Sequence, residues 1–98
     1  MDDKYVLDVS VRLDGERFSQ FIGMNDIELI REKFNRVAQK YLRKEISMHQ
    51  YQYEDMSNLI ELQLWERTAR QTYLGIGTHY YKYDKDIYDD ILSMLGLK

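Results

Sequence analysis

The chain of 98 residues contains no cysteine and no proline. Without cysteine it can form no disulfide and no zinc–thiolate site, and no thiol can act as a nucleophile. Without proline, the ends of helices and strands have to be predicted from Gly, Asn, Asp and Ser. No apolar run approaches the roughly 18 residues of a membrane-spanning helix, and the alternating N-terminal residues do not resemble a signal peptide. We therefore expect one cytoplasmic domain over residues 1–98.

The charge balance provides no net attraction to nucleic acid. Acidic residues outnumber basic ones by 17 to 14, which gives a formal charge of −3, so the whole-molecule field favours neither nucleic acid nor an anionic membrane. Apolar residues make up 44% and charged residues 32%, a composition typical of globular domains. The nine tyrosines favour strands and also interfaces, because each joins a large apolar ring to one hydroxyl.

A β-hairpin is predicted over residues 4–23. Its first strand alternates between apolar and polar residues, the period of a half-buried strand. Asp14 and Gly15 follow as the preferred pair for a two-residue type I′ turn. This turn sets a register in which apolar residues oppose one another at most positions, down to Leu7 opposite Ile22.

An amphipathic helix is predicted over about 26–45. Asn25 is a typical N-cap, and Glu28 follows at the spacing of a capping box. Apolar residues recur at spacings of three and four from Ile27 to Tyr41, which places them on one stripe of the helix. Its last turns carry cations, which suit the negative end of the helix dipole: Lys40, Arg43 and Lys44.

A second hairpin is predicted further along the chain. Apolar and polar residues alternate again over 60–64, and a partner strand is predicted over about 70–83. Pairing Glu66 with Arg70 around a three-residue loop gives a self-consistent register. In this register Tyr80 faces the core.

The remaining segments complete the predicted fold. Residues 46–58 have no clear period and predict a loop, with or without a short strand at 50–53. Asp84 or Asp86 caps a short C-terminal helix that Gly96 ends. The order β-β-α-β-β-α predicts an α+β fold, in which two β-hairpins form a four-stranded, mainly antiparallel sheet packed by one long helix and a short C-terminal helix. The order of the strands in the sheet stays open.

No pattern in the chain indicates an enzyme. The serines lie in no Gly-x-Ser-x-Gly motif, and His49 and His79 have no spacing typical of metal ligands. Gly75 and Gly77 lie between strand-like residues, so they predict a strand that admits an aromatic ring or a bulge, and not a phosphate loop. The acidic residues of 84–90 lack the EF-hand pattern and suit helix capping. We predict no catalytic residue, no metal and no cofactor.

An aromatic surface is the leading candidate for function. In the predicted register these side chains face away from the core: Trp65, Tyr73, His79, Tyr81 and Tyr83. We expect this surface to bind a protein partner or a second copy of the chain, with Asp84 and Asp86 steering a basic partner. One form of such a protein is a small inhibitor whose acidic edge occupies the nucleic-acid-binding site of its target. The small size, acidic charge, tyrosine content and lack of catalytic spacing are common among small accessory proteins of phages or mobile elements. The alternative is that the C-terminal helix folds across this face and makes it a second small core.

Nucleic-acid binding through basic residues ranks second. These residues lie on the polar side of the long helix and at the second hairpin tip: Arg36, Lys40, Arg43, Arg67 and Arg70. Glu32 precedes Arg36 by four residues, however, which is the ordinary spacing of an ion pair on a solvated helix face. No RNA-recognition motif with basic, glycine and aromatic residues is present.

Overall fold

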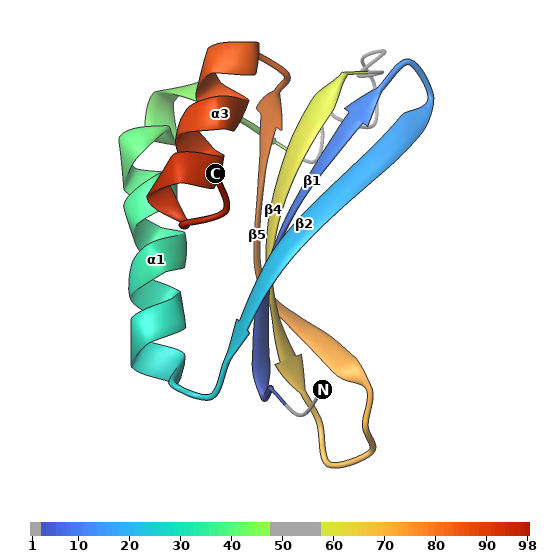
Figure 1. The fold of residues 1–98 in the computed structure, drawn as a ribbon, viewed down its shortest axis with the longest axis vertical. Coiled ribbons are helices and arrows are strands. Elements are labelled where there is room, and N and C mark those ends of the chain that lie inside the picture. Colours follow the sequence, from blue (N-terminus) through green and yellow to red (C-terminus); the bar gives the residue numbers. More distant parts are fainter. Residues whose placement is uncertain (1–2, 48–57) are drawn as a thin grey trace.

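The computed structural model describes residues 3–47 and 58–98 and shows an α+β fold, with an antiparallel sheet of five strands and two α-helices (Figure 1). The predicted fold class and order are confirmed, with five strands in place of four. The elements are β1 (Tyr5–Leu13), β2 (Glu16–Met24), α1 (Ile27–Lys40), a 3-10 turn (Leu42–Lys44), β3 (Glu45–Ile46), β4 (Leu59–Arg67), β5 (Tyr73–Lys82) and α3 (Lys85–Met94). In these two ranges, no helix is long and apolar enough to cross a membrane. The strand predicted at 50–53 and His49 lie outside the described residues.

The first hairpin has the predicted register. Leu13 pairs with Glu16, and Leu7 pairs with Ile22. Asp14 and Gly15 both adopt positive φ, at 51° and 85°. Positive φ at both central positions is what a type I′ turn requires, and Asp and Gly adopt it more readily than other residues. The turn therefore fixes the pairing of β1 with β2.

The long helix begins one residue later than predicted. The carboxylate of Asp26 accepts hydrogen bonds from the backbone N–H groups of Glu28 and Leu29, at 3.0 and 3.2 Å, and so caps the helix. The prediction of Asn25 as the cap is wrong: its amide oxygen accepts the backbone N–H of Lys4 at 2.8 Å. This bond ties the start of the helix to the start of β1.

The long helix also ends earlier than residue 45. Tyr41 is its C-cap, with φ −109° and ψ 22°, and its backbone N–H still bonds the carbonyl of Val37. The chain then turns through Leu42–Lys44, and Glu45 pairs with Tyr81 of β5. This pairing adds the fifth strand, β3, at the edge of the sheet.

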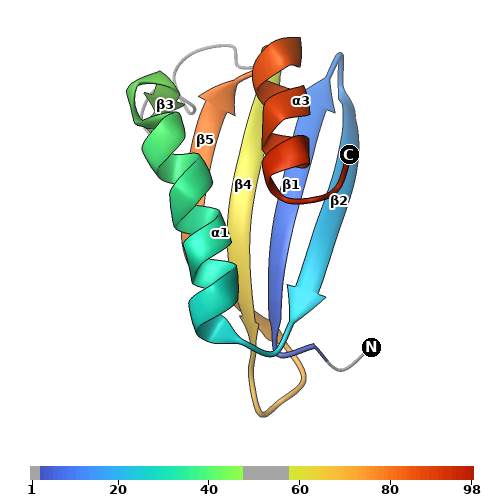
Figure 2. The ribbon, with the colours of Figure 1, turned by 60° about the vertical axis from the view of Figure 1, so that its left-hand side comes forward.

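The sheet has the order β2-β1-β4-β5-β3, so the two hairpins join through β1 and β4. Leu7 of β1 lies opposite Leu64 of β4, and Val9 lies opposite Leu62. Both helices cover the same face of the sheet, side by side (Figure 2). The core lies between them and that face, and its largest side chains with almost no exposure are Tyr81, Leu7, Ile30, Ile60, Leu62, Leu64 and Ile91.

The second hairpin forms with a register different from the predicted one. Its loop runs over 68–72 because the Thr68 backbone N–H bonds the carbonyl of Thr72 at 2.7 Å and the two hydroxyls bond at 2.8 Å. Glu66 consequently pairs with Leu74, four residues beyond the predicted partner. The prediction of a three-residue loop with Glu66 opposite Arg70 is wrong.

A β-bulge then reverses the faces of β5. Ile76 is the extra residue, between Gly75 and Gly77, which pair with consecutive residues of β4. Because side chains alternate with period two, one extra residue sends every later side chain of the strand to the opposite face. Tyr81 is therefore fully buried, and Tyr80 points away from the helices. The prediction that Tyr80 faces the core and Tyr81 faces outward is wrong.

Candidate protein-binding site

No described helix covers the second face of the sheet, which we call the open face (Figure 1). Its side chains alternate along each strand with those of the core. Cross-strand pairing brings them together in two halves, one rich in charged residues and one rich in aromatic residues. The two halves meet at Asp8 of β1.

The charged half is a network of paired side chains. Glu61 is almost fully buried, and its carboxylate lies 3.1 Å from Nε of Arg12 and 3.7 Å from a guanidinium nitrogen of Arg17. Arg17 also donates to the hydroxyl of Ser10 at 3.2 Å, and that hydroxyl lies 2.9 Å from the hydroxyl of Ser19. A buried carboxylate needs such partners, because an unpaired charge would be costly away from water. The charges of this half therefore serve the fold.

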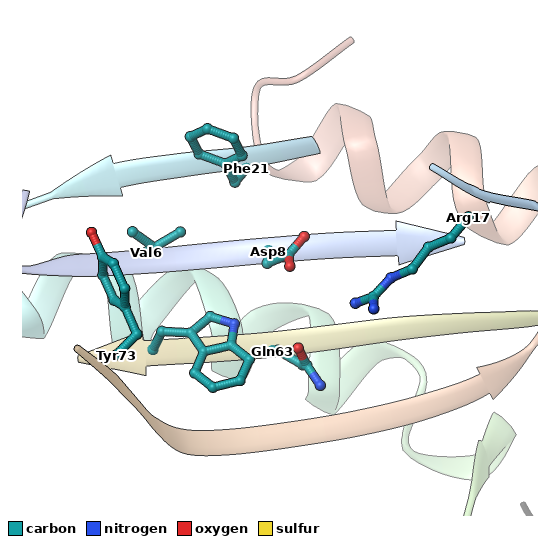
Figure 3. A pocket seen from close by; sticks show the side chains of 7 residues that line it. Val6, Asp8, Arg17, Phe21, Gln63 and Tyr73 are labelled. Atoms are coloured by element: carbon teal, nitrogen blue, oxygen red, sulfur yellow. The ribbon is translucent and has the colours of Figure 1, made fainter. Parts of the chain in front are cut away.

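The aromatic half contains a hollow of about 340 Å³, which we call the aromatic hollow (Figure 3). It draws on three strands and on the start of a fourth, since Val6 lies opposite Trp65, and Asp8 lies between Phe21 and Gln63. Its lining residues are Val6, Asp8, Arg17, Phe21, Gln63, Trp65 and Tyr73. Apolar walls with a few polar groups are typical of binding sites.

Asp8 is the anionic group of the aromatic hollow. Among the described residues, its carboxylate accepts one side-chain hydrogen bond, from the hydroxyl of Ser10 at 3.2 Å. Burial raises the pKa of Asp8 above its ordinary value of 3.8, while the Ser10 bond and the charge of Arg17 act in the opposite direction. The nearest cation, Arg17, is already bonded to Ser10 and paired with Glu61. The carboxylate therefore keeps acceptor capacity that faces the hollow.

Two glycines shape the surroundings of the hollow. A Cβ on Gly75 would lie 3.4 Å from Cζ3 of Trp65, so the indole packs over this glycine of the neighbouring strand. A Cβ on Gly23 would overlap the carboxylate of Asp3, so this second carboxylate lies over β2 next to Val6. The aromatic hollow thus has an acidic residue within it and another beside it.

Of the aromatic residues predicted to bind a partner, the structure brings only two to the open face. Trp65 and Tyr73 both line the aromatic hollow, and Tyr73 is 46% exposed. The four-residue displacement of the register kept these two on the predicted face, because an even displacement does not exchange the faces. Residues after the bulge lie on the face opposite to the predicted one.

The other predicted aromatic residues lie on the helix side. Tyr81 is buried with its ring 6.2 Å from that of Tyr41. His79 stacks 5.0 Å from the ring of Phe34, and its Nδ1 lies 2.5 Å from the carboxylate of Glu45. The prediction that these side chains share a surface with Trp65 is wrong, because the bulge turns them towards the helices.

For Tyr83, the alternative prediction of a small core under the C-terminal helix is correct. Its ring lies 6.1 Å from that of Tyr88 in α3, and it packs against the core. Asp84 caps α3, accepting the backbone N–H groups of Asp86 and Ile87 at 2.9 and 3.1 Å. Asp86 is exposed in the first helical turn. Both acidic residues thus have positions that helix capping and the helix dipole explain.

The predicted basic residues form two separate groups. Arg36 pairs with Glu32 at 2.8 Å, and Lys40 pairs with Asp90 at 2.6 Å, so partners on the protein offset both charges. The end of α1, near Arg43, and the 68–72 loop, near Arg67 and Arg70, lie at opposite ends of the molecule (Figure 1). The structure does not unite them into one basic surface.

Sequence reasoning missed the contribution of the first hairpin to the site. Val6 and Phe21 stand at positions that face away from the core, where a solvated face would carry polar residues. The signal in the sequence was the apolar character of these two positions. Phe21 is 58% exposed, so the fold leaves a large apolar side chain in contact with solvent.

Within 3–47 and 58–98, no three His, Asp or Glu side chains lie close enough together to hold a metal ion. Comparison of the chain with protein-family models, with curated proteins and with solved structures finds no match in any of the three.

Proposed function

We propose that the chain is a non-enzymatic, cytoplasmic binding protein that receives a basic segment of a partner protein in the aromatic hollow. The observation that carries this proposal is the half-buried carboxylate of Asp8, which accepts one side-chain hydrogen bond from the described residues and lies in a hollow with mainly apolar walls. Partial burial of a carboxylate costs free energy unless a counter-charge accompanies it. A cation supplied by a partner would remove that cost.

A lysine or arginine side chain fits the rest of the hollow. Its aliphatic stem would pack against Val6 and Phe21, while its charge lies near Asp8 and close to the face of the Trp65 indole. Trp is the best aromatic partner for a cation. The nearby carboxylate of Asp3 and the net charge of −3 both favour the approach of a basic segment.

A partner of this kind suggests how the protein acts. Basic, exposed segments are the surfaces with which proteins bind nucleic acid. A chain that occupies such a segment prevents nucleic acid from binding there. The proposal therefore includes a regulatory role, as an acidic inhibitor of a nucleic-acid-binding protein.

The experiment uses Trp65, the only tryptophan of the chain, as an internal reporter. We expect lysine- and arginine-containing peptides to change its fluorescence in a saturable way, and the same peptides with glutamine at the basic positions to leave it unchanged. Asp8→Asn should weaken the binding of the basic peptides about tenfold, since one charge-assisted hydrogen bond is lost.

Glu28→Gln is the matched control, because it removes an exposed carboxylate from α1, on the helix side of the molecule. It changes the net charge as Asp8→Asn does, and it should leave peptide affinity nearly unchanged. Equal affinities of the Asp8→Asn and wild-type proteins for basic peptides would contradict the proposal. So would a response of Trp65 to the glutamine peptides alone.

A further inference from the structure

The free edge of β2 is an unprotected surface for strand pairing. β2 is the outermost strand on its side of the sheet, and Figure 2 shows neither helix beyond it. It contains nine residues, pairs with β1 along its whole length, and has no bulge. A long, regular edge strand presents unpaired backbone groups that another strand can bind.

The turn determines which backbone groups of β2 are free. The pair that closes a two-residue hairpin, here Leu13 with Glu16, is hydrogen-bonded, and bonded pairs alternate along antiparallel strands. Every second residue from Glu16 therefore bonds to β1. The residues between them direct N–H and C=O to the free side, where they have no protein partner within the described chain: Arg17, Ser19, Phe21 and Gly23.

The composition of this edge also lacks the usual protection. Edge strands commonly carry charges, proline or bulges that prevent pairing with another molecule. Residues 18–24 contain no charge and no proline, and Phe18 and Phe21 are 51% and 58% exposed. The opposite edge of the sheet differs, because β5 has the bulge at Ile76 and is partly covered by β3. Among the described strands, only β2 has an edge that is open to a regular partner strand along its length.

We infer that β2 pairs antiparallel with β2 of a second copy of this chain, across a two-fold axis at Phe21, so that two five-stranded sheets become one continuous sheet. The sequence of β2 is complementary to itself in this register. Phe21 faces the second copy's Phe21 on the open face, and Phe18 faces the second copy's Met24 on the helix face. In the same register, Ser19 of each copy faces Gly23 of the other copy, and Gln20 of each copy faces Ile22 of the other.

Symmetric registers with the axis closer to the turn fit less well. An axis at Gln20 would oppose Arg17 to Gly23 and Glu16 to Met24, and so would bring both charged residues of β2 into the interface. An axis at Phe21 pairs uncharged residues only, and it places an aromatic ring against an aromatic ring and a methionine against a phenylalanine. Both kinds of contact are favourable in sheets and cores.

The pairing also changes the aromatic hollow. Phe21 lines the hollow and would also lie on the two-fold axis of the dimer. The hollows of the two copies would therefore adjoin across the dimer interface. Such a dimer could hold two basic segments of one partner at once, a consequence that rests on the proposed function. The strand pairing itself does not depend on it.

The test is sedimentation equilibrium over a concentration series from micromolar to submillimolar. Wild type should approach twice the mass of one chain at the upper end. Phe21→Lys and Phe21→Glu each place like charges across the axis and should weaken self-association about tenfold or more. A mixture of the two should associate again, because lysine then faces glutamate. Circular dichroism melts establish that each variant is folded.

Tyr73→Lys is the matched control, since Tyr73 is an aromatic residue of the open face with similar exposure and lies in β5, away from the β2 edge. It should associate as wild type does. A wild-type protein with the mass of one chain at all concentrations would overturn the inference, as would undiminished association of the Phe21 variants or a mixture that stays dissociated. The response of Trp65 to basic peptides is measured on the wild-type, Asp8→Asn and Glu28→Gln proteins, in which Phe21 and Tyr73 are unchanged, so failure of this inference and failure of the proposed function are separable.

Discussion

The ring of Phe34 occupies the space that a side chain at position 77 would need: a Cβ on Gly77 would lie 2.8 Å from Cζ of Phe34. Phe34 comes from α1 and is buried, so it fixes the helix against the strand at this glycine. Gly75, two residues earlier, lies under Trp65, and Ile76 between them is the bulge. Both parts of the prediction for these glycines are confirmed, because an aromatic ring packs against each glycine and a bulge lies between them.

Gly77→Ala should therefore destabilise the protein by about 1–3 kcal/mol, because the buried Phe34 ring has to move to make room for a methyl group. Gly75→Ala is the comparison, since its added carbon would lie 3.4 Å from Trp65, an ordinary contact, and should change the stability by less than about 0.5 kcal/mol. Urea unfolding measures both. Equal effects of the two substitutions would show that Phe34 does not pack as described.

Tyr81 and Tyr73 should respond differently to truncation. Tyr81→Ala removes a fully buried ring and should cost about 3–5 kcal/mol in unfolding free energy. Tyr73→Ala removes a ring that is nearly half exposed and should cost less than about 1 kcal/mol. A Tyr73 variant as unstable as the Tyr81 variant would place Tyr73 in the core, against the structure.

Tyr81→Phe isolates the hydroxyl of that residue. The hydroxyl is buried and bonds no group of the described chain, and burial raises its pKa above the ordinary value of 10.0. Its removal should leave the unfolding free energy unchanged or raise it by up to about 1 kcal/mol, because an unsatisfied polar group is lost from the core. Loss of stability in this variant would mean that the hydroxyl has a partner.

Asp90 joins the two helices in a pH-dependent way. Its carboxylate accepts hydrogen bonds from Lys40 and Tyr41, which lower the pKa of Asp90 below 3.8, while burial and Asp90 raise the pKa of Tyr41 to about 12. Because the folded state favours the ionised carboxylate, this stabilisation is present above the ordinary pKa and is lost as the pH falls through the lowered one.

Asp90→Asn should accordingly cost about 1–2 kcal/mol at neutral pH, and the difference from wild type should shrink in acid. Asp89→Asn is a matched control, because Asp89 is similarly exposed and pairs only with Lys98 among the described residues, so its loss should cost less than about 1 kcal/mol. Chemical unfolding at several pH values measures both. A constant difference between Asp90→Asn and wild type at all pH values would contradict the assigned role.

The basic residues of α1 provide a test of nucleic-acid binding. Replacing Arg36, Lys40 and Arg43 together by Gln should leave retention of DNA and RNA unchanged and low, because ion pairs within the protein offset the first two charges. Filter binding at several salt concentrations measures this. Strong retention by wild type that the triple change removes, with a flatter salt dependence, would instead favour the nucleic-acid function.

Local sequence determined the first hairpin completely. Asp14 and Gly15 adopt the positive φ that their types favour, and the strict alternation of β1 then leaves one register that buries its apolar face. The element order and both helices were predictable for the same reason, since their periods and caps are encoded in neighbouring residues. The cap of α1 was misplaced by one residue because Asn25 and Asp26 both suit an N-cap.

Only the tertiary structure decided the second hairpin and the candidate site. Which side of β5 faces the core depends on one extra residue, Ile76, whose bulge is set by the packing of rings on the two glycines beside it. An alternating pattern shows which residues share a face, but it specifies neither the neighbouring strand nor an inserted residue. The aromatic hollow brings Phe21 and Trp65 together from different hairpins, and that happens because the apolar side chains of β1 and β4 match across the centre of the sheet.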